Sequence, residues 1–175
     1  MKKFNLLLLD TDVIIELFRQ GIWDNIVGEC DVHVAETVVE EACYYDANNR
    51  THSIDLKKYG DEGKIVIFKA STSDVKKFGI AFDPVYLEKL DPGETESLTY
   101  LMNLPSEARL CSADKIVYRV LGNLDRSSQG ISLEEILKSL GLRRSLSHQF
   151  NKSYREYWTG EGVKERLQGI GKIKQ

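Results

Sequence analysis

Four carboxylates that lie far apart in the sequence could act together on a phosphate ester. Asp10 follows the apolar run FNLLLL, and Asp114 follows RLCSA. Glu41 lies in TVVEEA, and Glu94 follows a Pro-Gly pair at the start of a helical pattern. Two carboxylates about 4 Å apart repel by roughly 4 kcal/mol at an effective dielectric constant near 20. If the four meet, they therefore need raised pKa values or a bound cation.

A bound cation is the simpler of these two solutions, and it would supply a known chemistry. The ligands would all be oxygens, because His33, His52 and His148 lie outside the strand-to-helix junctions. Oxygen ligands favour Mg²⁺ or Mn²⁺ over Zn²⁺. Such an ion can activate water for attack on a phosphodiester and neutralise charge in the transition state.

Each of these acids also has an ordinary structural explanation. Asp is a good N-cap, which would account for Asp10 and Asp114 at helix starts. Glu in a first helical turn interacts favourably with the helix dipole, which would account for Glu94. A Glu on a helix after a strand, such as Glu41, is often surface charge. The functional interpretation therefore depends on the four acting as a set.

Two of the four acids have acidic neighbours that could take their place. Glu40 precedes Glu41, and Glu96 follows Glu94 by two residues. Because helix residues one or two apart point in different directions, only one of each pair can serve.

The elements that must position these acids follow from the apolar pattern. FNLLLL is a continuous apolar run, as expected for a strand that is buried on both faces of a parallel sheet. A helix is expected to begin just after Asp10. Further strands are predicted at 31–35, 64–68 and 109–112, and further helices at 37–45, 73–78, 93–103, 113–121 and 132–140. In the last of these, Ser132 and Glu135 have capping-box spacing.

This alternation predicts an α/β fold with three layers, α/β/α, around a mainly parallel central sheet. The carboxyl ends of parallel strands lie at one edge of the sheet, where ligands collect. Asp10 and Asp114 both follow apolar strands, so we expect them to meet at that edge.

Composition fits one domain with its own core. The chain has 175 residues, of which 42% are hydrophobic, so disordered chains and small disulfide scaffolds are poor fits. The three cysteines, Cys30, Cys43 and Cys111, are odd in number and widely spaced, and we expect reduced core thiols. The first apolar run is cut short by Asp10 and Asp12, so no membrane segment is expected, and a cytoplasmic protein follows.

Charge is unevenly distributed. The whole chain has a net charge of −3, residues 143–175 carry +5 and residues 1–142 carry −8. An acidic body with a basic tail fits carboxylates that hold metal and a tail that meets phosphates. The tail could equally be a solvated, polar C-terminus.

Several motifs together resemble the PIN-domain family of metal-dependent ribonucleases. LLLLDTDVIIELF is similar to the family's opening strand and acid, and TVVEEA to its second acidic segment. LDPGETESLTYL resembles the Gly-Glu helix start, LCSADKIVYRVL the last acidic strand end, and GISLEEILKSLGL the closing segment. The resemblance covers most of residues 4–142.

This resemblance implies a PIN-like fold with metal bound by the four acids of the set defined above. It further implies that Thr11 and Ser112 are supporting hydroxyls. Three features depart from the family pattern: Asp12 stands where Asn is usual, residues 52–85 form a longer insertion, and a tail follows Leu142. Asp12 could join the metal shell or cap the helix.

The expected activity is therefore divalent-metal-dependent hydrolysis of RNA by an endoribonuclease, with water as the nucleophile. Residues 1–142 would form the nuclease domain, and residues 143–175 a helical basic extension for packing, RNA contact or subunit contact. Many PIN domains are toxins of toxin-antitoxin pairs, so the resemblance also implies a possible antitoxin partner. A homodimer is expected.

Two other interpretations stay open. LLLLDTDVI also resembles the first motif of haloacid-dehalogenase-like phosphatases, in which Asp10 would be the nucleophile and Asp12 the acid/base. The late Gly-Asp motif of that family has no good counterpart, because Gly60-Asp61 precedes its nearest strand. Alternatively, the chain could be an inactive PIN-like binding module.

The tail contains an aromatic stripe that either interpretation must explain. Phe150, Tyr154, Tyr157 and Trp158 have helical spacing, which favours packing over base stacking.

Overall fold

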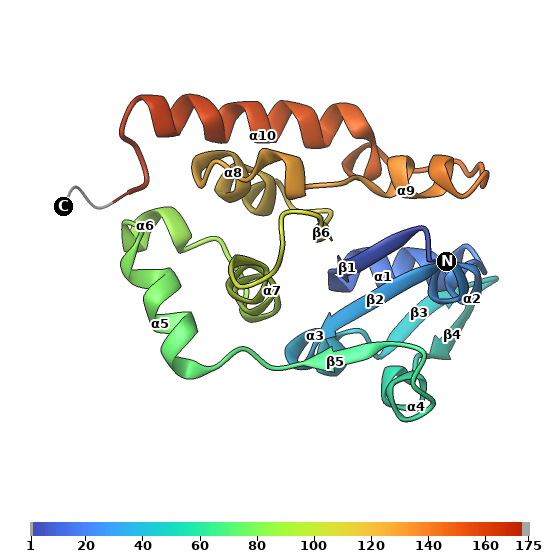
Figure 1. The fold of residues 1–175 in the computed structure, drawn as a ribbon. Coiled ribbons are helices and arrows are strands. Elements are labelled where there is room, and N and C mark those ends of the chain that lie inside the picture. Colours follow the sequence, from blue (N-terminus) through green and yellow to red (C-terminus); the bar gives the residue numbers. More distant parts are fainter. Residues whose placement is uncertain (1, 173–175) are drawn as a thin grey trace.

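A four-stranded parallel sheet forms the centre of the molecule in a computed structural model that describes residues 2–172. The strands are β1 (Phe4–Leu9), β2 (Cys30–Ala35), β5 (Val66–Phe68) and β6 (Arg109–Cys111). All three pairings are parallel, and the order across the sheet is β5-β2-β1-β6. Helices flank this sheet (Figure 1), so the predicted α/β fold with three layers and a parallel centre is confirmed.

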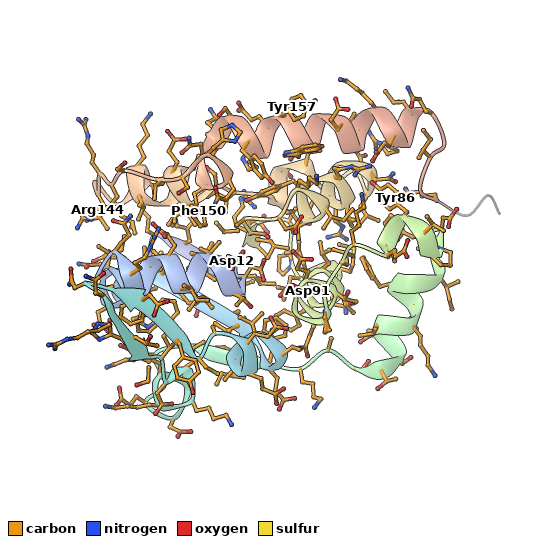
Figure 2. All side chains as sticks on the ribbon, turned by 180° about the vertical axis from the view of Figure 1, so that it is seen from behind. Asp12, Tyr86, Asp91, Arg144, Phe150 and Tyr157 are labelled. Carbon is orange, nitrogen blue, oxygen red and sulfur yellow. The ribbon has the colours of Figure 1, made fainter. Side chains whose placement is uncertain are left out.

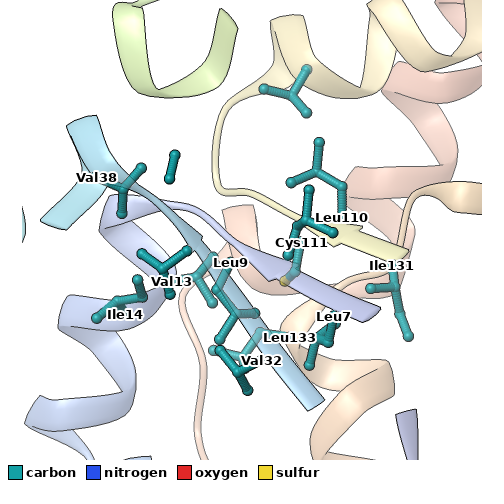
Figure 3. Packing of buried hydrophobic residues seen from close by; sticks show 14 of the residues in the cluster. Leu7, Leu9, Val13, Ile14, Val32, Val38, Leu110, Cys111, Ile131 and Leu133 are labelled. Atoms are coloured by element: carbon teal, nitrogen blue, oxygen red, sulfur yellow. The ribbon is translucent and has the colours of Figure 1, made fainter. Parts of the chain in front are cut away.

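β1 is central because its side chains are apolar on both faces. Leu7, Leu8 and Leu9 are at most 1% exposed. Leu9 pairs with Cys111 of β6, so the carboxyl ends of these two strands lie side by side. Figure 3 shows Leu7 and Leu9 packed among apolar side chains of β2, of β6, of the helix α1 (Thr11–Arg19) and of the segment before the helix α9 (Leu133–Ser139). Burial of this run on both faces fixes the edge where the candidate site lies.

Most of the helices around these strands begin with a side-chain N-cap. These helices are α1 (Thr11–Arg19), α2 (Trp23–Glu29), α3 (Glu36–Glu41), α7 (Pro92–Met102), α8 (Lys115–Asn123) and α9 (Leu133–Ser139). α1, α7 and α8 each have an aspartate N-cap whose side chain accepts a hydrogen bond from the first turn. The capping box predicted from Ser132 and Glu135 is present at α9.

The insertion between α3 and α7 contains elements that the pattern did not predict. They are the hairpin strands β3 (Tyr44–Ala47) and β4 (Arg50–Ser53), and the helices α4 (Leu56–Asp61) and α6 (Pro84–Leu87). The strand β5 and the helix α5 (Thr72–Ile80), in the same segment, were predicted at 64–68 and 73–78. Asn48 and Asn49 both have positive φ, as a two-residue hairpin turn requires. The predicted helix over 37–45 is wrong beyond residue 41, because Tyr44 and Tyr45 pair with β4 instead.

The C-terminal segment packs against the body as a long helix. α10 (Lys152–Leu167) lies along α8 (Figure 1). The two backbones touch through glycines: a Cβ on Gly162 would lie 2.0 Å from the Arg119 carbonyl oxygen, and one on Gly122 would lie 2.2 Å from the Thr159 carbonyl oxygen. This close approach is possible only without side chains.

The aromatic stripe of the tail divides between packing and solvent. Phe150 is 4% exposed, and Tyr154 packs edge-on against Tyr118 of α8. Tyr157 is 60% exposed on the outer side of α10 (Figure 2). The packing role predicted for the stripe therefore holds for Phe150 and Tyr154 and fails for Tyr157.

Among residues 2–172, no helix is both long and apolar enough to cross a membrane.

Candidate active site

Asp10 lies at the carboxyl end of β1, where it is 6% exposed and caps α1. Its Oδ1 accepts a hydrogen bond from the Thr11 amide at 2.8 Å, and its Oδ2 accepts one from the Ser112 hydroxyl at 2.7 Å. Burial raises the pKa of Asp10 to about 6, although both hydrogen bonds oppose the shift. The two hydrogen bonds therefore hold the carboxylate in one orientation, but they only partly offset the free-energy cost of burying its charge.

Ser112 connects the ends of β1 and β6. Besides donating to Asp10, its Oγ accepts a hydrogen bond from the Asp114 amide at 3.0 Å. Its backbone is held by the Tyr118 hydroxyl, which donates to the Ser112 carbonyl at 2.7 Å. The predicted meeting of the two strand ends is confirmed, and Ser112 lies where a supporting hydroxyl was expected.

Asp114 caps α8 and faces the same region. Its Oδ1 accepts a hydrogen bond from the Ile116 amide at 3.0 Å, which accounts for the capping role. Its charge also raises the pKa of Asp12 and of Glu94. The capping and cluster roles coexist because a carboxylate has two oxygens.

The start of α7 brings Glu94 to this edge from a different part of the chain. Glu94 and Asp91 form a capping box: the Asp91 amide donates to Glu94 Oε2 at 3.1 Å, and the Glu94 amide donates to Asp91 Oδ1 at 2.7 Å. Glu94 is 3% exposed. Burial, followed by the charges of Asp10, Asp91 and Asp114, raises its pKa to about 9.

Asp91 is a member of the cluster that the sequence analysis missed. Its charge raises the pKa values of Asp10, Asp12 and Glu94. The signal was present as the aspartate before Pro-Gly-Glu, which is the N-cap of a capping box. Figure 2 shows Asp12 at the start of α1 and Asp91 at the start of α7, on neighbouring parts of the molecule.

Glu41 is the last residue of α3 and is attached to the site through a hydroxyl. Thr11 Oγ1 donates to Glu41 Oε2 at 2.8 Å. A Cβ on Gly93 would lie 2.9 Å from the Val38 side chain and 3.2 Å from Glu41 Oε2, so α3 and α7 approach each other at this glycine. Glu41 therefore lies between α1 and the start of α7, and Thr11 supports it as expected.

The two alternative glutamates line a neighbouring hollow beside the start of α7. Glu96 is 9% exposed and accepts hydrogen bonds from the Thr37 amide and hydroxyl and from the Ala70 amide. Glu40 is exposed and, with Glu96 and Asp91, lines a hollow of about 480 Å³ between α3 and the start of α7. The geometry therefore favours Glu94 over Glu96, and Glu41 over Glu40.

Asp12 faces the cluster from the first turn of α1. Burial raises its pKa first, followed by the charges of Asp114 and Asp91. The N-cap of α1 is Asp10, so Asp12 is not needed for capping. Its position fits a contribution to the charge of the site.

Six carboxylates thus gather at one sheet edge without a compensating cation. They are Asp10, Asp12, Glu41, Asp91, Glu94 and Asp114. Across residues 2–172, no Lys, Arg or His side chain forms an ion pair with any of them. Lys115 is the nearest basic residue in sequence, but its Nζ lies 5.2 Å from the centre of the Trp158 ring.

The donor set fits a hard divalent cation, but its side chains do not form a closed cage. Within the described part of the chain, no three His, Cys, Asp or Glu side chains are arranged as a ready metal-binding group. The capping box and the Thr11 and Ser112 hydroxyls hold the carboxylates through internal hydrogen bonds.

Comparisons of the chain with protein-family models, with curated proteins and with solved structures give no match. The PIN resemblance consequently stays a prediction that depends on the motifs and on this geometry.

Proposed function

We propose that this protein is a Mg²⁺- or Mn²⁺-dependent endoribonuclease of the PIN type. The observation that carries the proposal is the meeting of acids from three separate junctions at one edge of a parallel sheet. β1 supplies Asp10, β6 supplies Asp114 and the start of α7 supplies Glu94, with Glu41 beside them. Such an edge is where parallel α/β folds bind ligands.

The side chains have separate parts in the proposed reaction. Asp10, Glu94 and Asp114 would hold the ion, and Glu41 would complete the set from α3. Ser112 keeps Asp10 in one orientation through a hydrogen bond of 2.7 Å, which is the usual work of a residue behind a metal ligand. A bound Mg²⁺ or Mn²⁺ would supply Lewis acidity and lower the pKa of water.

The charge balance of the site supports this assignment. The pKa of Glu94 is raised to about 9 and that of Asp10 to about 6, so the cluster is poorly stable when fully ionised. A divalent cation relieves that repulsion, and an RNA phosphate is repelled until the cation is present. Cleavage should therefore depend strictly on the ion.

The finer features of the proposal follow from the family resemblance. A PIN-type ribonuclease of this size suits the toxin of a toxin-antitoxin pair, with RNA as substrate in the cytoplasm, an antitoxin protein as inhibitor and a homodimer as the acting form. RNA would be distinguished from DNA by contacts to the 2′-hydroxyl.

The proposal is tested by following the cleavage of structured and single-stranded RNA while Mn²⁺ is titrated. Asp10→Asn keeps a good N-cap but loses a charged ligand, so it should cut at least about 100-fold more slowly. Asp83→Asn is the matched control, because Asp83 caps α6 by accepting from the Val85 amide at 2.9 Å. Equal rates for wild type and Asp10→Asn would remove the mechanism.

The same assay separates the competing interpretations. A phosphatase of the haloacid-dehalogenase type would hydrolyse a small phosphomonoester and form a trappable aspartyl phosphate, an acyl phosphate, on Asp10. An inactive binding module would hold RNA without cutting it at any Mn²⁺ concentration.

A further inference from the structure

Much of the basic charge of the tail is used inside the molecule. Residues 143–175 carry a net charge of +5, yet Arg155 forms two hydrogen bonds to Glu135, at 2.8 and 2.9 Å. Arg166 pairs with Asp125 at 2.7 Å, and Lys164 pairs with Glu161. These residues attach α10 to the body or stabilise the helix, so they are poorly placed to meet a ligand.

One group of basic residues is placed differently. Lys138, Arg143 and Arg144 line a hollow of about 660 Å³ between the end of α9 and the loop that follows it, and Leu142 and Leu146 form its apolar part. We call this the loop hollow. Across residues 2–172, none of its three cations has a carboxylate within 4.0 Å.

The carboxylate at the rim of the loop hollow, Glu134, is engaged in a hydrogen bond with the backbone. Glu134 accepts a hydrogen bond from the Lys152 amide at 2.6 Å, at the start of α10. Arg143 and Arg144 are both exposed. The hollow therefore presents three cations and one engaged carboxylate to solvent.

The loop is held in place by hydrogen bonds. Gly141 ends α9 with a φ of +71°, and the Leu142 amide donates to the Leu137 carbonyl at 2.9 Å. Gln20, at the end of α1, donates from Nε2 to the Ser145 carbonyl at 3.1 Å. The basic side chains are thus presented from a defined backbone.

α1 relates the loop hollow to the acidic cluster. Asp10 caps one end of this helix and Gln20 the other. At 1.5 Å per residue, the two ends lie about 15 Å apart. Figure 2 shows Arg144 near the opposite end of α1 from Asp12. Since each nucleotide of a stacked B-form strand advances by about 3.4 Å, a strand needs only a few nucleotides to span that distance.

We propose that the loop hollow binds the phosphate backbone of a single-stranded RNA whose next few nucleotides reach the acidic cluster. This inference deepens the proposed function and rests on it. Arginine matches a phosphate with a planar pair of donors, and its face can also stack on a base. The leucine walls suit an unstacked base beside the phosphate.

Binding is measured by fluorescence anisotropy with a labelled 12-nucleotide RNA, in an Asp10→Asn background so that the RNA survives. The test variant is Lys138→Gln/Arg143→Gln/Arg144→Gln. The control is Lys57→Gln/Lys58→Gln/Lys76→Gln, which removes the same charge from exposed positions on α4 and α5. Arg143→Gln/Arg144→Gln is the second variant, because Lys138 lies in the last turn of α9 and its loss could weaken that helix.

Loss of three phosphate contacts should weaken RNA binding at least about tenfold and flatten the slope of log K against log salt by about 2. The control should change affinity no more than about twofold. The loss should also be larger for the 12-nucleotide RNA than for a 3-nucleotide RNA, which is too short to reach both sites. Equal losses in the test and control variants would overturn the inference.

Two further outcomes separate this inference from the proposed function. If wild type fails to cut RNA while binding still depends on the loop hollow, the nuclease proposal fails and the phosphate site stands. If wild type cuts RNA and the test variant binds like the control, the inference alone fails. Binding of single-stranded DNA of the same sequence shows whether the 2′-hydroxyl contributes. If polyglutamate competes fully with RNA, the loop hollow binds anions in general, and the RNA assignment is overturned.

Discussion

Replacing Glu94 with Gln should stabilise the metal-free protein at neutral pH. Glu94 is 3% exposed, and its pKa is raised from 4.5 to about 9. An unfolded chain releases this proton near pH 4.5, so the folded state loses about 1.4 kcal/mol per pH unit above that value. At pH 7 the cost reaches at most about 3.5 kcal/mol. The carboxamide of Glu94→Gln keeps an acceptor for the Asp91 amide and has no charge to lose.

The assay is thermal unfolding of wild type and Glu94→Gln in a chelator between pH 4 and pH 8. Near pH 4 the two should melt together, and at pH 7 the variant should melt up to about 10 °C higher. With Mn²⁺ present, the wild type should gain more than the variant, because the ion binds the folded state through the charged side chain.

Glu135→Gln is the matched control, because Glu135 occupies the same position in the capping box of α9. Burial opposes ionisation of Glu135, but hydrogen bonds from Arg155 and Ser132 outweigh it and lower the pKa. A lowered pKa gives stability that is present above pH 4.5 and is lost as the pH falls, so this variant should be less stable at pH 7. A pH-independent difference between wild type and Glu94→Gln would refute the reasoning.

Three further substitutions distinguish residues that support ion binding from residues that stabilise the fold. Ser112→Ala removes the hydroxyl that joins the two strand-end acids, so Mn²⁺ affinity in calorimetry should fall about 10- to 100-fold while the fold is kept. Glu96→Ala leaves buried donors at the start of α3 without an acceptor, so the free energy of unfolding in urea should fall by about 2–3 kcal/mol, and an equal loss of Mn²⁺ affinity would contradict its structural role. Gly162→Ala places a Cβ 2.0 Å from the Arg119 carbonyl oxygen and should cost about 1–3 kcal/mol, whereas Gly160→Ala on the same helix meets no atom within 4 Å and should be neutral or stabilising.

The central sheet could be predicted because its strands consist mainly of apolar residues, which indicates that they are buried. FNLLLL is apolar on both faces, and the strand observed there has the predicted bounds, Phe4–Leu9. The same pattern located the start of α1 and the cap of α9. The meeting of the strand ends that precede Asp10 and Asp114 then followed from topology, since parallel strands end at one edge.

Other features depend on tertiary contacts that local pattern does not show. Tyr45 continues the helical spacing of α3, but stacking on His52, with ring centroids 4.9 Å apart, places it in a hairpin. α2 is short and contains Gly28, and its Trp23 packs on Phe18 of α1, at 5.0 Å between ring centroids.

The candidate site was predictable only in part. Asp91 was not predicted, although an aspartate before Pro-Gly-Glu is typical of a helix N-cap. The family motif contains only Glu94, so it does not indicate Asp91. The choice between Glu94 and Glu96 needed the hydrogen bonds of Glu96 to Thr37 and Ala70. The basic charge of the tail can be counted in the sequence, but only the structure shows that Arg155 and Arg166 use theirs in ion pairs with Glu135 and Asp125.

Calorimetric titration of the wild-type protein with Mn²⁺ at pH 7, in buffers of different ionisation enthalpy, tests most directly whether the crowded acids hold a cation. Glu94 is protonated at that pH, since its pKa is about 9, and must ionise to bind the ion. The account predicts saturable binding with release of about one proton per ion, and loss of that release in Glu94→Gln. Absence of binding at millimolar Mn²⁺, or binding without proton release, would contradict it.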